Sequence, residues 1–164
     1  GAAMVDVLRR VRAEGGVTAL DFGPVIDPIA TPDEFGELLP YVSFVLANEY
    51  ELCSSAGTSD VGEAAEDFLA AGAQAVVAKR GPGGATLTTR ERSLAVPALT
   101  VEAKGTVGAG DSFNAGFLHA MVQGRSPRDA VAYANAVAAL VVASERGAMG
   151  APTAAEVDAV IARR

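Results

Sequence analysis

The sequence predicts an α/β fold with a mostly parallel central sheet, formed by residues 1–164 as a single domain. Apolar stretches of strand length alternate with stretches of helix length, an order that favours a parallel sheet covered by helices on both faces. A chain of 164 residues is long enough for one such domain and short for two. Apolar residues make up 50% of the chain, a composition that excludes a disordered or collagen-like protein.

The first half of the chain supplies the predicted parallel strands. In the opening helix, Val5, Leu8 and Val11 recur at helical spacing, and Gly15-Gly16 ends the pattern. The predicted helices of this half are residues 3–14, 31–39 and 61–71, the last ended by Gly72. The predicted strands are 17–21, closed by Gly23-Pro24, then 43–47 and 75–79.

The second half begins with a hairpin and continues mostly as helix. Gly81-Pro-Gly-Gly84 separates the third strand from strand 85–89, and 93–96 is a further short strand. The predicted helices are 111–123, 127–143 and 153–162. Thr153 with Glu156 three residues later forms the capping-box pattern that opens the last of these helices.

Charge and composition exclude several function classes. With 20 acidic and 13 basic residues the net charge is −7, so we expect no nucleic-acid partner. The longest dense apolar run, 136–143, falls well short of the roughly 18 residues that span a bilayer, and no signal-peptide pattern opens the chain. We therefore expect a cytoplasmic protein with no membrane partner. A single Cys53 and a single His119 exclude a disulfide within the chain and a zinc site.

The most informative segment is the Gly-rich stretch Gly105-Thr-Val-Gly-Ala-Gly-Asp111-Ser112, which runs into a predicted helix. Its spacing matches the P-loop pattern, except that Asp111 stands in place of lysine. Backbone N–H groups and the start of the helix can still hold a phosphate. A carboxylate beside that phosphate suits a general base that deprotonates an attacking hydroxyl. The alternative is an ordinary helix cap, which the loop alone leaves open. A dinucleotide fold fits worse, because Phe113 occupies the position of the third glycine.

Several motifs together resemble the ribokinase-like (PfkB) carbohydrate and nucleoside kinases. The segment from Gly105 to Phe117 resembles the family's C-terminal signature, and Asn48-Glu-Tyr-Glu51 resembles its N-x-x-E motif. Lys79-Arg-Gly-Pro-Gly-Gly84 is similar to the family's nucleotide-binding strand end, while 134–136 and 145–150 resemble segments that flank adenine and a monovalent cation. The resemblance implies a three-layer ribokinase-like sandwich and covers nearly the whole chain.

The resemblance also implies roles for individual residues. Asp111 would be the catalytic base, and the N–H groups of Gly108, Ala109 and Gly110 would form the anion hole. Asn48 and Glu51 would act on Mg²⁺ through water. The residues implied to contact ATP are Asn48, Glu51, Lys79, Gly81, Gly84, Thr106 and Asn135.

The sequence departs from the family at two points. Gly105 replaces an aspartate associated with the cation loop, which leaves the backbone carbonyls of Val107, Val142 and Ala148 as the candidate K⁺ ligands. The family chain is also nearly twice as long, and its first half brings the acceptor-binding residues and a lid. Gly1-Ala-Ala-Met4 does not begin with methionine, and the resemblance starts near the middle of such a kinase. We therefore expect the C-terminal part of a kinase, without the N-terminal half and lid, and little activity from this piece alone.

The expected function is phosphoryl transfer from ATP to a hydroxyl of a sugar, with Asp111 as base. Alternatives are a nucleoside or a small non-sugar alcohol as acceptor, and a nucleotide-binding module without transferase activity. Among partners, a homodimer is an expectation. Other candidates have simpler interpretations. His119 lies about two turns beyond Asp111 and is interpreted as packing or surface, and Cys53 as an inert thiol. Asp21 and Asp27 are interpreted as turn residues, with contact to an acceptor as the alternative.

Overall fold

The computed structural model describes residues 2–22 and 30–163. Two compact units are separable within it, the first formed by Gly1–Lys79 with Thr86–Ser93 and the second by Arg80–Ala85 with Leu94–Arg164. The single domain expected from the chain length stays a prediction. The Gly23-Pro24 turn and Asp27 lie outside the described residues.

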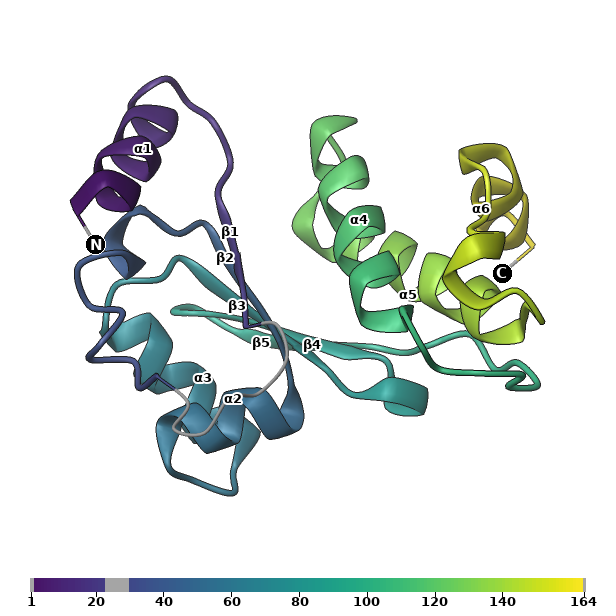
Figure 1. The fold of residues 1–164 in the computed structure, drawn as a ribbon, viewed down its shortest axis with the longest axis horizontal. Coiled ribbons are helices and arrows are strands. Elements are labelled where there is room, and N and C mark those ends of the chain that lie inside the picture. The colour runs from purple at the N-terminus through teal and green to yellow at the C-terminus, as the bar shows by residue number, and fades with distance from the viewer. Residues whose placement is uncertain (1, 23–29, 164) are drawn as a thin grey trace. The chain divides into compact units, whose positions relative to one another are not determined.

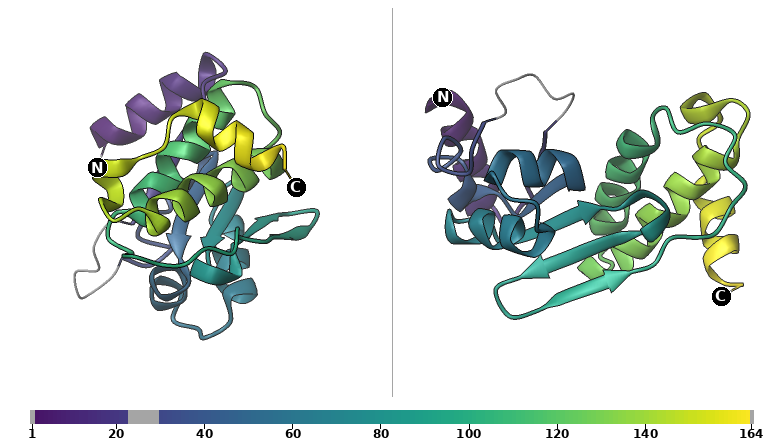
Figure 2. Two further views of the ribbon diagram at one scale, coloured as in Figure 1. Left: turned by 90° about the vertical axis from the view of Figure 1, so that its right-hand side faces the viewer. Right: turned by 90° about the horizontal axis from the view of Figure 1, so that it is seen from below.

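The sheet confirms the predicted parallel arrangement. β1 (Ala19–Asp21) pairs in parallel with β2 (Phe44–Asn48), and β2 pairs in parallel with β3 (Ala75–Lys79). β4 (Ala85–Thr89) and β5 (Ser93–Val96) complete the order β1-β2-β3-β4-β5, and their arrows run in opposite directions in Figure 2. Asn48 and Lys79 are partners in the β2–β3 register, so the carboxyl ends of these two strands are level.

Helices of the first unit cover one face of its strands. α2 (Glu49–Ala56) and α3 (Val61–Ala70) contact each other and the strands β2 and β3 (Figure 1). One buried cluster joins Val45, Ala47, Val76 and Ala78 to Leu52 and Phe68. The alternate strand residues Leu46 and Val77 are buried as well, which is the pattern of a parallel sheet covered on both faces.

The second unit is built on three helices. α4 (Ala109–Val122) packs against α5 (Pro127–Ala143), and α5 packs against α6 (Ala154–Ile161). Gly116 allows the close approach of α4 and α5, because a Cβ there would lie 2.8 Å from a Val137 methyl group. Two short 3₁₀ helices complete the unit, η2 (Gly81–Gly83) and η3 (Gly147–Gly150).

The first unit differs from the sequence predictions in two places. The helix predicted over 31–39 is wrong: residues 32–38 form turns, followed by the 3₁₀ helix η1 (Leu39–Tyr41). Thr31 closes the first turn by hydrogen bonds with Glu34, and Pro40, which has no N–H to donate, occupies the 3₁₀ turn. The helix α2, in contrast, was not predicted, because Asn48-Glu-Tyr-Glu51 was interpreted only as a ligand-binding motif.

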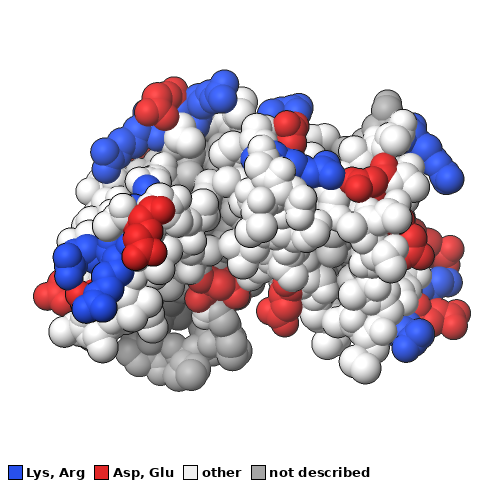
Figure 3. Space-filling model, turned by 90° about the horizontal axis from the view of Figure 1, so that it is seen from above, with Lys and Arg blue, Asp and Glu red and all other residues white. Residues whose placement is uncertain are grey.

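The start of the chain is a helix with paired surface charges. α1 (Ala2–Ala13) buries no residue, and Asp6 accepts from Arg9 and Arg10 at 2.6 and 2.8 Å. Acidic and basic groups also lie side by side over the face seen in Figure 3. Within residues 2–22 and 30–163, no helix is long and apolar enough to cross a membrane.

Candidate active site

The Gly-rich loop ends in a left-handed glycine that starts α4. Gly108 has φ +77° and is the N-cap, with Ala109 as the first helical residue. A Cβ on Gly108 would lie 2.6 Å from the Ala148 side chain in η3. This position therefore requires glycine for two reasons, its backbone conformation and the close approach of η3.

The start of α4 presents backbone donors. The Ala109 N–H donates to Thr106 O at 3.1 Å, so it does not fit the anion hole predicted for it. The Ser112 N–H donates to Gly108 O at 2.9 Å. Among the described residues, the N–H groups of Gly108, Gly110 and Asp111 have no acceptor. Three open N–H groups at a helix start, where the helix dipole is positive, fit a phosphate group.

Asp111 lies in the first turn of α4 beside these donors. Its residue is exposed, and within the part of the chain that the structure describes its carboxylate makes no hydrogen bond or ion pair. The partial positive charge at the start of a helix attracts a carboxylate in the first turn. The carboxylate is therefore accessible to a bound molecule, and the role of Asp111 as a general base stays a prediction.

Asn48 and Glu51 form a reciprocal capping box at the start of α2. Asn48 Oδ1 accepts from Glu51 N–H, and Glu51 Oε2 accepts from Asn48 N–H, both at 2.8 Å. The N-x-x-E pattern therefore has a structural role that needs no ligand. Glu51 Oε1 has no partner among the described residues, so one oxygen of this carboxylate is available.

Lys79 is paired with a residue to which the sequence analysis gave no part in ATP binding. The Lys79 ammonium lies 3.0 Å from Asp21 Oδ1, and the Lys79 side chain is 14% exposed. Asp21 was interpreted as a turn residue, yet it is the last residue of β1. Its position at the carboxyl end of a predicted parallel strand was the available signal, because ligands bind at that edge in such sheets.

Gly81, Gly84 and Asn135 belong to the second unit. A Cβ on Gly84, whose φ is +88°, would overlap Val96 O and lie 2.6 Å from Ala98 N. The buried Asn135 amide donates to Val96 O at 2.9 Å and to Pro97 O at 3.3 Å. Gly84 and Asn135 thus meet at the same carbonyl, while Gly81 has φ +52° and no neighbour within 4 Å of a built Cβ.

The three carbonyls expected to bind K⁺ differ in their hydrogen bonds. Val142 O accepts from Lys104 N–H at 2.8 Å and from Gly105 N–H at 3.3 Å, so both of its lone pairs are used. Ala148 O accepts from Ala151 N–H at 3.2 Å. Within the described residues, Val107 O alone of the three has no N–H partner. Val142 does not fit as a cation ligand in this arrangement, and K⁺ binding stays a prediction.

The residues set aside in the sequence have structural surroundings. Burial, together with the carboxylates of Glu49 and Asp60, raises the pKa of the Cys53 thiol, which disfavours the reactive thiolate. His119 contacts the ring of Tyr133, with 5.6 Å between the ring centres. Arg125 lies over the same Tyr133 ring and pairs with Asp158 at 2.7 Å. His119 therefore belongs to the packing of α4 on α5.

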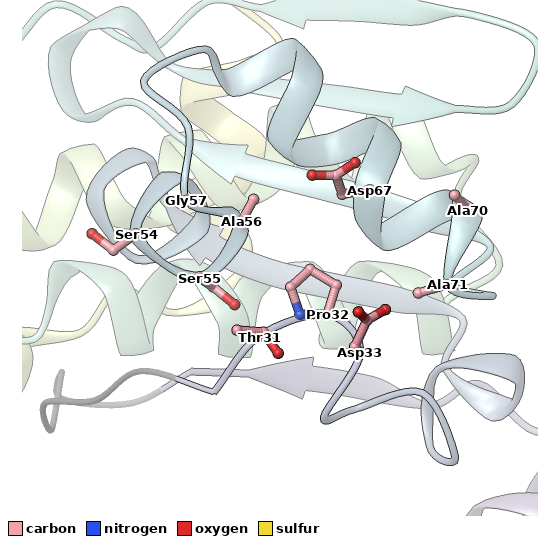
Figure 4. A pocket seen from close by; sticks show the side chains of 10 residues that line it. All are labelled: Thr31, Pro32, Asp33, Ser54, Ser55, Ala56, Gly57, Asp67, Ala70 and Ala71. Carbon is pink, nitrogen blue, oxygen red and sulfur yellow. The ribbon is translucent and has the colours of Figure 1, made fainter.

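A pocket of about 620 Å³ lies in the first unit. Figure 4 shows Asp33 and Asp67 at its rim, with Ser54 and Ser55 from the end of α2. Ser55 donates to the Ala30 carbonyl, so this hydroxyl is already paired. None of the predicted site residues lines this pocket.

Comparison with known proteins identifies the family. The model of the pfkB family of carbohydrate kinases matches residues 2–154. The chain belongs to this family. It is 36% identical over 136 residues to a 1-phosphofructokinase of Haloferax volcanii, covering 80% of this chain and 42% of that protein. It is 35% identical over 133 residues to an ATP-dependent ribose-1-phosphate kinase of Halopiger xanaduensis, covering 80% of this chain and 43% of that protein.

Solved structures confirm the ribokinase-like fold. The chain resembles the ribokinase of Arabidopsis thaliana, solved with ribose and ATP, with a TM-score of 0.85 and 26% identity over 97% of this chain and 52% of that one. It also resembles the ribokinase of Thermotoga maritima, with a TM-score of 0.81 and 28% identity over 95% of this chain and 52% of that one. The chain spans about half the length of the relatives it matches.

Proposed function

We propose that this chain is the nucleotide-binding part of a kinase that transfers the γ-phosphate of ATP to a hydroxyl group of a sugar. The observation that carries the proposal is the start of α4, where the Asp111 carboxylate lies near the N–H groups of Gly108, Gly110 and Asp111 itself, which have no acceptor among the described residues. Family membership supports the reaction class, and the Arabidopsis ribokinase solved with ribose and ATP supports the two substrates.

Asp111 acts as the general base in this proposal. Its carboxylate takes the proton of the acceptor hydroxyl, and the resulting oxygen attacks the γ-phosphorus. The bond from that phosphorus to the bridging oxygen of ADP breaks, and ADP leaves with the electron pair. The N–H groups of Gly108 and Gly110 stabilise the negative charge on the transferred phosphoryl group.

The remaining predicted residues bind and orient ATP. Mg²⁺, when bound, would neutralise charge on the phosphates, and Glu51 Oε1 is the carboxylate oxygen that remains for a water ligand of that ion. Gly84 and Asn135 fix the backbone around Val96, which would serve as a wall beside the nucleotide. In this role Asn135 shapes the adenine site through the backbone rather than by donating its amide to adenine.

The test is the variant D111N in the longest available version of the gene product. We expect ADP formation with MgATP and a panel of sugars, sugar phosphates and nucleosides to fall by about 10²–10⁴-fold, the usual contribution of a general base. MgATP binding should change little. Wild-type turnover by D111N would overturn the mechanism.

A second candidate is a nucleotide-binding module without transferase activity. It is favoured by the match to about half of each relative, since the proposed acceptor pocket lies in the other half. MgATP binding without ADP formation in the longest version, for every acceptor of the panel, would establish this candidate. Sugar-dependent release of ADP would exclude it.

A further inference from the structure

Asp21 and Lys79 lie on one face of the sheet at its carboxyl edge. Asp21 pairs in register with Leu46, and Leu46 pairs with Val77. Residues in register share a face in a parallel sheet, and so do residues two apart along a strand. Asp21, Asn48 and Lys79 therefore share the face opposite to Val45 and Val76, which contact the α2–α3 cluster.

The Lys79 side chain crosses the end of β2 to reach Asp21. The two residues stand on β3 and β1, with β2 between them, yet the ammonium and the carboxylate are 3.0 Å apart. The Lys79 side chain is 14% exposed and the Asp21 side chain 35% exposed, so the ammonium is largely covered while its partner lies at the surface. Asp21 balances the charge of an ammonium that water reaches only in part.

The position of the pair connects it to the proposed nucleotide site. Asn48, the register partner of Lys79, is also the N-cap of α2 and part of the motif proposed to act on Mg²⁺. A lysine side chain loses much rotamer freedom when it is fixed, so an ammonium that is already held binds phosphate at a lower entropic cost.

We propose that Asp21 is a positioning residue of the nucleotide site, which holds the Lys79 ammonium over the carboxyl end of β2, beside Asn48, for the phosphates of ATP. This inference rests on the proposed function, since it assumes that MgATP binds at this edge. Asp21 itself touches neither ATP nor the acceptor in this role, and it acts through Lys79.

The test is a double-mutant cycle in the longest available version of the protein. Binding of MgATP is measured by calorimetry for the wild type, D21N, K79M and the double variant, so that no acceptor is needed. We expect D21N and K79M each to weaken MgATP binding by about tenfold, the scale of a lost charge-assisted contact. D21N should have little further effect in the K79M background. D21E, which keeps the charge, should recover much of the affinity.

Each outcome of the cycle supports or overturns the inference. Unchanged or tighter MgATP binding by folded D21N would overturn it, because Asp21 would then be only structural or would mainly repel the phosphates. An equal loss with and without Lys79 would overturn it too. If D21N does not fold, folded K79M with wild-type affinity for MgATP overturns the inference. A wild-type protein that binds no MgATP overturns the proposed function itself, whereas normal wild-type binding with an unaffected D21N overturns the inference alone.

Discussion

The backbone conformation of Gly108 determines how α4 begins, at the proposed phosphate site. Its positive φ turns the chain so that α4 begins with its N–H groups open, and its missing Cβ gives room to Ala148. The positive φ and the contact with Ala148 both constrain Gly108, but substitutions can separate the two effects. The Gly105 position, where the family usually has aspartate, has no neighbour within 4 Å of a built Cβ.

We predict that G108A lowers the free energy of unfolding by about 1–3 kcal/mol, because alanine is strained at this φ and its methyl group meets Ala148. Adding A148G should recover the part due to that contact and leave the part due to φ. The matched control G105A should stay within about 0.5 kcal/mol of the wild type. Urea unfolding measures all of these variants. A G108A protein as stable as G105A would contradict the structure at this loop.

Two helices, α2 and α6, begin with a capping box, and they show what the sequence could and could not predict. Thr153 and Glu156 were predicted as a capping box, and α6 confirms it. Asn48 and Glu51 have the same geometry at α2, yet that helix was missed because the pattern was assigned only to ligand binding. Local spacing predicts a cap reliably, whereas a motif shared by caps and ligand sites has two meanings that spacing cannot separate.

Contacts between distant segments were beyond prediction for a different reason. The strands 43–47 and 75–79 were found within one residue, because dense apolar runs mark buried parallel strands. Strand 17–21 starts late, at Ala19, because the Thr18 and Ser43 hydroxyls and N–H groups bond to each other before it. The Asp21–Lys79 pair and the carbonyl shared by Gly84 and Asn135 depend on register and approach, which no local pattern encodes.

The capping box of α6 should make the stability of the protein depend on pH. Hydrogen bonds from the Thr153 backbone N–H and hydroxyl lower the pKa of Glu156 below its ordinary value of 4.5. A group whose pKa is lower in the folded state stabilises the fold above its unfolded pKa and loses that contribution as the pH falls through its folded pKa. We expect the E156Q variant to be less stable than the wild type at pH 7, with a difference that shrinks below pH 4.5. Urea midpoints across this range measure the effect. A constant difference would show that the charge plays no part.

At the scale of the whole molecule, the chain matches about half of each relative, and this predicts which steps of the proposed reaction it can carry out alone. Phosphoryl transfer to a hydroxyl requires that water be kept from the γ-phosphate, which closure around both substrates provides. The proposed nucleotide residues and the base are in these 164 residues, whereas the resemblance places the lid and the acceptor residues in the other half. We predict that the 164-residue chain binds MgATP but forms no ADP in response to sugars, and that the longest version of the gene product does both. A coupled assay for ADP, run on both proteins with D111N of the longer one as the blank, measures the difference. Sugar-dependent turnover by the 164-residue chain at the rate of the longer protein would refute this division, because the base and the anion site would then suffice without closure.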